Sequence, residues 1–286
     1  MYIAIDNGGS TTRVGRIGDL SQPPIEVIEQ FPTSQSYEAQ IEKLLESIAS
    51  AVGGEHLEGI GIALGGHIAQ DGLSVRDAAN LREYAGKPFV RQLQAAFDCP
   101  VRLAHDTVCG LLAEKAFGAL APFDLCAYLT VSTGTGAAIQ LRKAGQALTV
   151  SMEMGHQLLA GNTRPCLCGQ IGCLETITGG RQIALRRQQM ARREAAESND
   201  PGFWQEFTEA LALGIVNLTR LTRVEALAIS GGIAQRAPYL KAHLPERVAA
   251  LCVRDVPQLF WSQLDENAPL LGAALLLETP EATIIH

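Results

Sequence analysis

The chain has 286 residues, 47% of them hydrophobic, and its 23 basic and 30 acidic side chains give a net charge of −7 at pH 7. A chain of this size can bury a large core. Its negative charge argues against a general attraction to nucleic acid or to an anionic membrane. No apolar run has the length of a signal peptide or a membrane span. We therefore expect a cytosolic protein with no nucleic-acid or membrane partner.

Strand and helix patterns alternate along the chain and predict an α/β fold. Short β patterns over 2–5 and 14–17 flank a glycine-rich turn over 6–12, which predicts a hairpin. Apolar residues at a period near 3.6 predict an amphipathic helix over 37–52. The remaining predicted strands cover 59–64, 101–104, 126–131, 137–141 and 226–229, and the remaining predicted helices cover 109–117, 180–197, 203–224 and 270–277.

The predicted helix over 180–197 carries five arginines, at positions 181, 186, 187, 192 and 193. Such a run invites a nucleic-acid interpretation. Glutamates follow at 194 and 197 and the whole chain is acidic, so we expect a solvated helix face.

Three turns rich in glycine and hydroxyl side chains follow predicted strands, over 6–12, 132–136 and 230–232. Glycines let backbone amides approach an anion closely, and Ser or Thr hydroxyls add donors. One such turn alone is more often a plain tight turn, and neither the P-loop nor the dinucleotide spacing is present. Three together predict a phosphate site. Asp6 beside the first turn offers an oxygen to Mg²⁺, through water.

One histidine and three cysteines form a cluster with the spacing of metal ligands: His156, Cys166, Cys168 and Cys173. One imidazole and three thiolates are the ligand set of a closed tetrahedral zinc site. Four protein ligands leave no open position, so the zinc would be structural. The zinc segment would also fix Glu153 and Glu175, which stand just outside its two ends, close together.

These residues together resemble the ROK family of sugar kinases and sugar-responsive repressors, over essentially the whole chain. The run Asp6-Asn7-Gly8-Gly9-Ser10-Thr11 looks like the family's opening phosphate motif. Glu153-Met154-Gly155-His156 and the Cys-x-Cys-Gly-x-x-Gly-Cys-x-Glu run over 166–175 look like its signature. The resemblance implies an actin-like ATPase (ribonuclease H-like) fold, with two α/β lobes and a ligand cleft between them. We expect a smaller lobe over 1–115, joined by a C-terminal helix over 268–286, and a larger lobe over 116–267 that carries the zinc loop.

Carried over by position, the resemblance implies that Asp106 is the general base of an ATP-dependent sugar kinase. The acceptor would be a hydroxyl, the 6-OH, of a hexose or N-acetylhexosamine such as glucose, N-acetylmannosamine or N-acetylglucosamine. The implied sugar contacts are Gly65, Gly66, Asn80, His105, Glu153, His156 and Glu175. The implied contacts to ATP and Mg²⁺ are Asp6, Gly8, Gly9, Ser10, Thr11, Thr133, Gly134, Gly136, Gly231 and Gly232.

One departure leaves the sugar open, because His105 stands where the family usually has Asn. The runs Ser132-Thr133-Gly134 and Leu270-Leu271-Gly272-Ala273-Ala274 look similar to N-acetylmannosamine kinases, which favours that substrate. The alternative is a catalytically weak sugar-binding sensor or regulator. Family repressors carry a helix-turn-helix ahead of the phosphate turn, whereas Asp6 comes almost at once, so this regulator would lack a DNA-binding module. A homodimer is the family's habit and is expected here.

Overall fold

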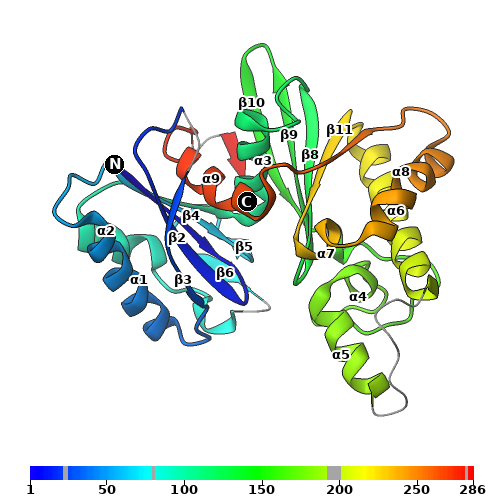
Figure 1. Cartoon of the computed structure of the whole chain (residues 1–286), viewed down its shortest axis with the longest axis horizontal. Coiled ribbons are helices and arrows are strands. Elements are labelled where there is room, and N and C mark those ends of the chain that lie inside the picture. Colours follow the sequence, from blue (N-terminus) through cyan, green and yellow to red (C-terminus); the bar gives the residue numbers. More distant parts are fainter. Residues whose placement is uncertain (22–24, 79–80, 192–200, 281–282) are drawn as a thin grey trace.

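The computed structural model describes residues 1–21, 25–78, 81–191, 201–280 and 283–286. Two sheets lie in separate halves of the molecule, and helices α3 and α9 lie between them (Figure 1). The N-terminal half carries α1 and α2 on its outer side, and the other half carries α6 and α8. The chain therefore has the α/β class and the two-part architecture that its sequence predicts.

Both sheets repeat one strand order. The first sheet is β3-β2-β1-β4-β7, and the second, read from its other edge, is β13-β10-β9-β8-β11-β12. The strands of the first sheet are β1 Tyr2–Asn7, β2 Thr11–Ile17, β3 Glu26–Pro32, β4 Gly59–Leu64 and β7 Val101–His105. Those of the second sheet are β8 Leu125–Val131, β9 Thr135–Lys143, β10 Gln146–Met152, β11 Ala226–Ser230, β12 Gln258–Trp261 and β13 Ile284–Ile285. In each sheet three antiparallel strands come first and two parallel strands follow beside the first of them. A separate hairpin consists of β5 His67–Ile68 and β6 Val75–Asp77.

Local sequence explains the helix ends where capping side chains are present. The helices are α1 Tyr37–Val52, α2 Phe89–Phe97, α3 Asp106–Phe117, α4 Glu175–Thr178, α5 Gly180–Ala191, α6 Pro201–Thr222, α7 Gly232–Gln235, α8 Pro238–Cys252 and α9 Ala268–Leu275, with short 3-10 turns η1 Arg82–Tyr84, η2 Met154–His156 and η3 Asp265–Asn267. The Ser36 hydroxyl accepts from the Ala39 amide at the start of α1. Gly53 ends that helix in the left-handed conformation, at φ 54°.

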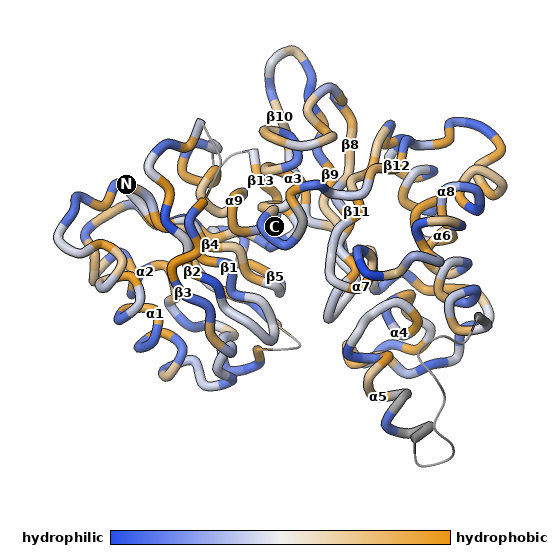
Figure 2. Tube along the Cα trace, viewed as in Figure 1, coloured by the Kyte–Doolittle hydropathy of each residue, from blue (hydrophilic) through white to orange (hydrophobic). Residues whose placement is uncertain are grey.

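Three apolar clusters make the core. One lies between the first sheet and α1 and α2, one lies against α6 and α8, and the third lies between the sheets around α3 and α9. Figure 2 shows the hydrophobic colour of the first sheet's central strands, whereas α1 alternates between hydrophobic and hydrophilic residues. This is the pattern of an element that buries one face.

Glycines allow α9 to pack very closely on its neighbours. A Cβ on Gly272 would lie 1.7 Å from the Cys109 carbonyl oxygen of α3, and a Cβ on Gly61 would lie 1.8 Å from the Ala273 carbonyl oxygen. Neither contact leaves room for a side chain. Helices α3 and α9 are therefore pressed together between the two sheets, and α3 carries the predicted base at its first position.

The predicted hairpin at the start of the chain is confirmed, and the span predicted for α1 is the observed one. The helix predicted over 109–117 begins earlier, at Asp106, because His105 caps it. The helix predicted over 180–197 is described only as far as Ala191, and 192–200 lie outside the described residues.

The prediction of a C-terminal helix over 268–286 was wrong about where this helix ends. Helix α9 ends at Leu275, ahead of Pro280, a residue that cannot continue a helix. Residues Ile284 and Ile285 pair instead with Thr149 and Val150 of the second sheet. The division into lobes at 115 and 116 stays a prediction, and it falls inside α3. A membrane-spanning helix would have to be longer or more apolar than the helices found among the described residues.

Candidate active site

The first two glycine-rich turns occupy matching places in the two sheets, and the third lies in the second sheet. The first joins β1 to β2, the second joins β8 to β9, and the third follows β11. In each of the first two, a backbone amide closes the turn: Gly8 donates to Thr11 and Ser132 to Gly134. The third turn needs glycine, since Gly231 has φ 98° and a Cβ there would lie 2.4 Å from the Val131 carbonyl oxygen. All three turns therefore lie at the carboxyl ends of strands, β1 in the first sheet and the paired β8 and β11 in the second, where α/β folds bind ligands.

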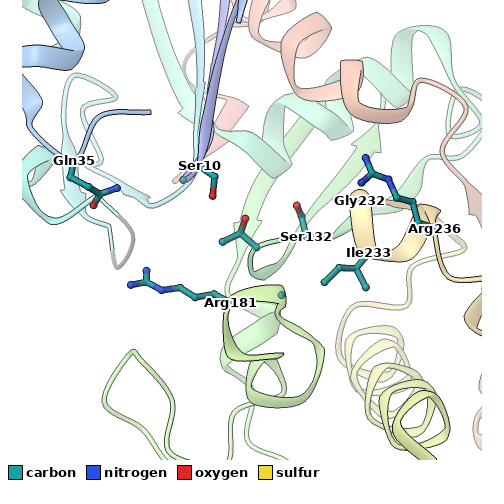
Figure 3. A pocket seen from close by; sticks show the side chains of 10 residues that line it. Ser10, Gln35, Ser132, Arg181, Gly232, Ile233 and Arg236 are labelled. Atoms are coloured by element: carbon teal, nitrogen blue, oxygen red, sulfur yellow. The ribbon is translucent and has the colours of Figure 1, made fainter. Parts of the chain in front are cut away.

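A cavity of about 610 Å³ opens between these turns (Figure 3). It is lined by Gly9, Ser10, Gln35, Ser132, Thr133, Gly180, Arg181, Gly232, Ile233 and Arg236. Ser10 comes from the first sheet and Ser132 from the second, whereas Arg181 and Arg236 stand on different sides of the cavity. Main-chain amides, hydroxyls and two guanidinium groups around one space are what a polyphosphate group requires.

Four of the residues predicted to contact ATP, the phosphoryl donor, line this cavity: Gly9, Ser10, Thr133 and Gly232. We call it the donor cavity, and the three glycine-rich turns the donor turns. Sequence reasoning missed Gln35 and Arg236, and it assigned Arg181 to a solvated helix face. The structure corrects that assignment, because the amides of Gly180 and Arg181 donate to the Ser132 and Thr133 carbonyls and fix the start of α5 against the second turn. The Gly-Gly-Arg run at the head of the helix was the available signal.

The other predicted donor residues lie around the cavity without lining it: Asp6, Gly8, Thr11, Gly134, Gly136 and Gly231. Of these, Gly136 faces the start of α3 and not the cavity, since a Cβ there would lie 3.0 Å from Thr107 Cγ2 and 3.8 Å from His105 Cε1. Asp6 forms an ion pair with Arg13 at 2.6 Å. Burial raises the pKa of Asp6 to about 6, against the lowering effect of Arg13 and with a further rise from the charges of Asp106 and Glu266.

Asp106 begins α3 directly after β7. Its Oδ1 lies 2.9 Å from His105 Nδ1, and a Cβ on Gly65 would lie 3.4 Å from its Oδ2. Gly66, with φ 147°, packs against Ala78. The structure thus brings Gly65, His105 and Asp106 together at the ends of two adjacent parallel strands, β4 and β7. Asn80 lies outside the described residues.

The neighbouring imidazole controls the charge of Asp106. Burial raises the pKa of Asp106, but the charge and hydrogen bond of His105 outweigh burial, so the pKa lies below its ordinary value. Burial lowers the pKa of His105, and the Asp106 and Glu153 carboxylates reverse this, so the pKa lies above its ordinary value. Asp106 is therefore ionised at neutral pH, the state in which a carboxylate can accept a proton.

The predicted metal ligands meet in space. The ligand atoms of His156, Cys166, Cys168 and Cys173 all lie within 4.8 Å of one another. The Cys168 and Cys173 sulfurs are 3.7 Å apart, and Cys166 Sγ is 3.8 Å from His156 Nδ1. Thiolates about 2.3 Å from a tetrahedral ion would be separated by about 3.8 Å. The donor set and its spacing therefore fit one tetrahedral metal ion.

The two predicted carboxylates beside this cluster have different surroundings. Glu153 Oε2 lies 3.8 Å from His156 Nε2, whereas Cys166 Sγ lies near the other ring nitrogen, and Glu153 Oε1 lies 3.4 Å from His67 Nδ1 of β5. Glu175 Oε2 accepts from the Thr135 amide at 2.8 Å, at the start of β9. Glu153 thus meets the hairpin of the first half of the chain, whereas Glu175 joins the metal segment to the donor turn. His67 has no place in the motifs and was missed.

Comparison with known proteins decides the family. The ROK family matches residues 2–279. The chain belongs to the ROK family. It is 25% identical over 308 residues to a glucokinase of Thermotoga maritima, with 96% of each chain covered. It is 27% identical over 312 residues to an N-acetyl-D-glucosamine kinase of Escherichia fergusonii, covering 96% of this chain and 99% of that one.

Among solved structures, a ROK glucokinase of Streptomyces griseus in complex with glucose and AMPPNP superposes with a TM-score of 0.80. It shares 22% sequence identity with this ROK protein and covers 96% of this chain and 98% of its own. This likeness confirms the predicted actin-like fold.

Proposed function

We propose that this ROK protein is an ATP-dependent sugar kinase that phosphorylates a hydroxyl, the 6-OH, of a hexose or N-acetylhexosamine. The kinase class is supported by its curated relatives, which are a glucokinase and N-acetylglucosamine kinases along nearly their whole length. The observation that best supports the kinase function is the position of Asp106. Its ionised carboxylate stands beside Gly65 and directly after β7, which pairs with β4, the strand next to β1 and its phosphate turn.

The reaction needs little covalent chemistry from the protein. A sugar hydroxyl oxygen forms the new bond to the γ-phosphorus, the bond to the leaving oxygen of ADP breaks, and the hydroxyl proton passes to Asp106. The amides and hydroxyls of the donor turns and the cavity arginines neutralise charge on the phosphates. Mg²⁺ supplies further positive charge when it is bound, with Asp6 as the carboxylate that would hold it through water.

The acceptor contacts would be Gly65, Gly66, His105, Glu153, His156 and Glu175, with Asn80 among them. In two of these residues, one polar atom of the side chain already has another partner, so only the second atom is left for the sugar. His156 would bind the metal through Nδ1, which leaves Nε2 for a sugar hydroxyl. Glu175 already uses Oε2 on the Thr135 amide, which leaves Oε1.

Zinc is the metal that the Cys₃His set favours, and four protein ligands make it structural. The sugar-sensor alternative gains no specific observation, because the proposed base and the donor cavity are both present. A homodimer and a cytosolic location stay predictions.

The direct test is phosphorylation of a sugar panel with MgATP. Glucose, mannose, fructose, allose, N-acetylglucosamine and N-acetylmannosamine would be compared by kcat/KM, with product position assigned by NMR. We expect turnover of at least one sugar with the phosphate on its 6-oxygen. A protein that binds ATP and a sugar but transfers no phosphate to any of the six would favour the sensor.

A further inference from the structure

Arg13 forms an ion pair with Asp6, the residue that opens the first phosphate motif, but itself belongs to none of the predicted motifs. It is the direct cross-strand partner of Asp6 in the β1–β2 ladder, and directly opposed side chains share one face of a sheet. Both side chains are largely buried, at 13% and 14% exposure. Nε and Nη2 of Arg13 both donate to Asp6 Oδ2, at 3.2 and 2.6 Å. The guanidinium therefore orients the carboxylate through one of its two oxygens.

The same guanidinium also reaches a segment that is distant in the sequence. Its Nη1 donates to Asn267 Oδ1 at 3.3 Å, and its Nη2 also donates to the Glu266 carbonyl oxygen. These two acceptors lie in η3, just before α9 and 253 or 254 positions away in the chain. A surface arginine without a structural task rarely combines such burial with acceptors from two distant segments.

Glu266 extends this network to the cavity wall. Its Oε1 accepts from Arg236 Nη2 at 2.8 Å, and Arg236 lines the donor cavity on the side of α7 (Figure 3). Arg13 thus stands between the carboxylate beside the first phosphate turn and a cationic wall of the cavity. The peptide unit and the side chain of one residue, Glu266, make the connection.

We propose that Arg13 is a positioning residue for the phosphoryl donor. It fixes the Asp6 carboxylate at the first phosphate turn and, through Glu266, the segment that faces Arg236. The proposal rests on the proposed kinase function. Bound triphosphate with its Mg²⁺ carries several charges, and a site that orients its partners in advance binds them better than one that must order them on binding. Arginine suits this task because its planar fork serves several acceptors at once, which a lysine ammonium does not do in the same geometry.

The test compares Arg13→Gln with Arg16→Gln, a control on the same strand whose guanidinium pairs with the exposed Glu26 at 2.9 Å. Calorimetry would measure binding of a non-hydrolysable ATP analogue with Mg²⁺ and, separately, of the best sugar. We expect Arg13→Gln to weaken nucleotide binding about tenfold, the effect of one lost charge-assisted hydrogen bond, and to leave sugar binding unchanged. Arg13→Lys should recover part of the loss, and Arg16→Gln should match the wild type.

If Arg13→Gln fails to fold, Asn267→Ala is the second variant to measure. It removes one acceptor of the Arg13 guanidinium and should weaken nucleotide binding by a smaller factor. Unchanged nucleotide affinity in the folded Arg13 variants would overturn the proposal, as would equal losses of nucleotide and sugar affinity, which mark a merely structural role. Wild-type protein that transfers phosphate to no sugar would contradict the kinase function instead. The binding measurement needs no turnover, so it still decides the role of Arg13.

Discussion

His105 Nδ1 lies 2.9 Å from Asp106 Oδ1, 3.2 Å from the Thr107 amide nitrogen and 2.7 Å from Thr107 Oγ1, so one ring nitrogen faces three partners, among them a carboxylate and an amide. Protonated Nδ1 donates to the carboxylate, whereas unprotonated Nδ1 accepts from the amide and caps α3. The two contacts cannot operate together because one needs a proton on the nitrogen and the other needs a lone pair. The protonation of His105 therefore links the start of α3 to the charge around the proposed base.

Replacing the proposed base is the plainest prediction. Asp106→Asn keeps the size of the side chain but cannot accept the hydroxyl proton, so turnover should fall by about a hundredfold or more. Sugar and nucleotide affinities should stay near those of the wild type. Asp98→Asn is the matched control, since Asp98 is exposed and sits in a left-handed conformation, at φ 49°, that Asn tolerates. Near wild-type turnover in folded Asp106→Asn would refute the assignment.

The ranking of sugars should depend on His105. Asn donates and accepts through one amide, whereas neutral His does so through two ring nitrogens in a larger plane. His105→Asn should therefore reorder the values of kcat/KM across the sugar panel. An unchanged order would show that His105 does not contact the acceptor.

The His105–Asp106 pair also predicts a pH dependence of stability. The raised pKa of His105 contributes stability that is complete below its ordinary value of 6.5 and is lost as pH rises through the raised pKa. The lowered pKa of Asp106 contributes stability that is present above its ordinary value of 3.8 and is lost as pH falls through the lowered pKa. The melting temperature of His105→Asn should thus fall furthest below wild type between these values and approach it at alkaline pH. His56→Asn, at an exposed histidine, is the matched control for the substitution itself.

Nucleotide binding should weaken in acid because of Asp6. Burial raises its pKa to about 6, so the carboxylate gains a proton as pH falls through about 6 and can no longer serve Mg²⁺. Terminal phosphates also titrate near pH 6, so wild type must be compared with Asp6→Asn, which keeps only the ligand's own titration. Identical pH profiles of MgATP affinity for the two proteins would show that Asp6 has no part in binding the metal–nucleotide complex.

Local signals explain why much of the fold was predictable. Ser36 and Gly53 bound α1 from within its own sequence, and the cysteine cluster closes over a short stretch of chain. The contacts of Arg13 with Glu266 and Asn267 were beyond reach, because they join segments more than 250 positions apart whose approach depends on how the two sheets pack. The same holds for β13, whose edge pairing depends on the position of β10 in space.

Metal removal should affect sugar before nucleotide. Without a cation the three thiolates repel or reprotonate, and the segment from His156 to Cys173 gains conformational freedom. Glu153 and Glu175 stand at the two ends of this segment, so both would lose their fixed placement. Sugar affinity should therefore fall most in Cys168→Ser.

Nucleotide affinity should also fall, though less. Glu175 bonds to the Thr135 amide, and the amides of Gly180 and Arg181 bond to the second phosphate turn, so disorder in the metal segment can reach one wall of the donor cavity. Calorimetry with each ligand, and metal analysis on the same samples, would measure both effects, with Cys99→Ser as the control at a free cysteine outside the cluster. Sugar binding that survives complete loss of the metal would show that the cluster does not shape the acceptor site, because contacts such as those with the Thr135 amide and His67 would then suffice to order the two carboxylates.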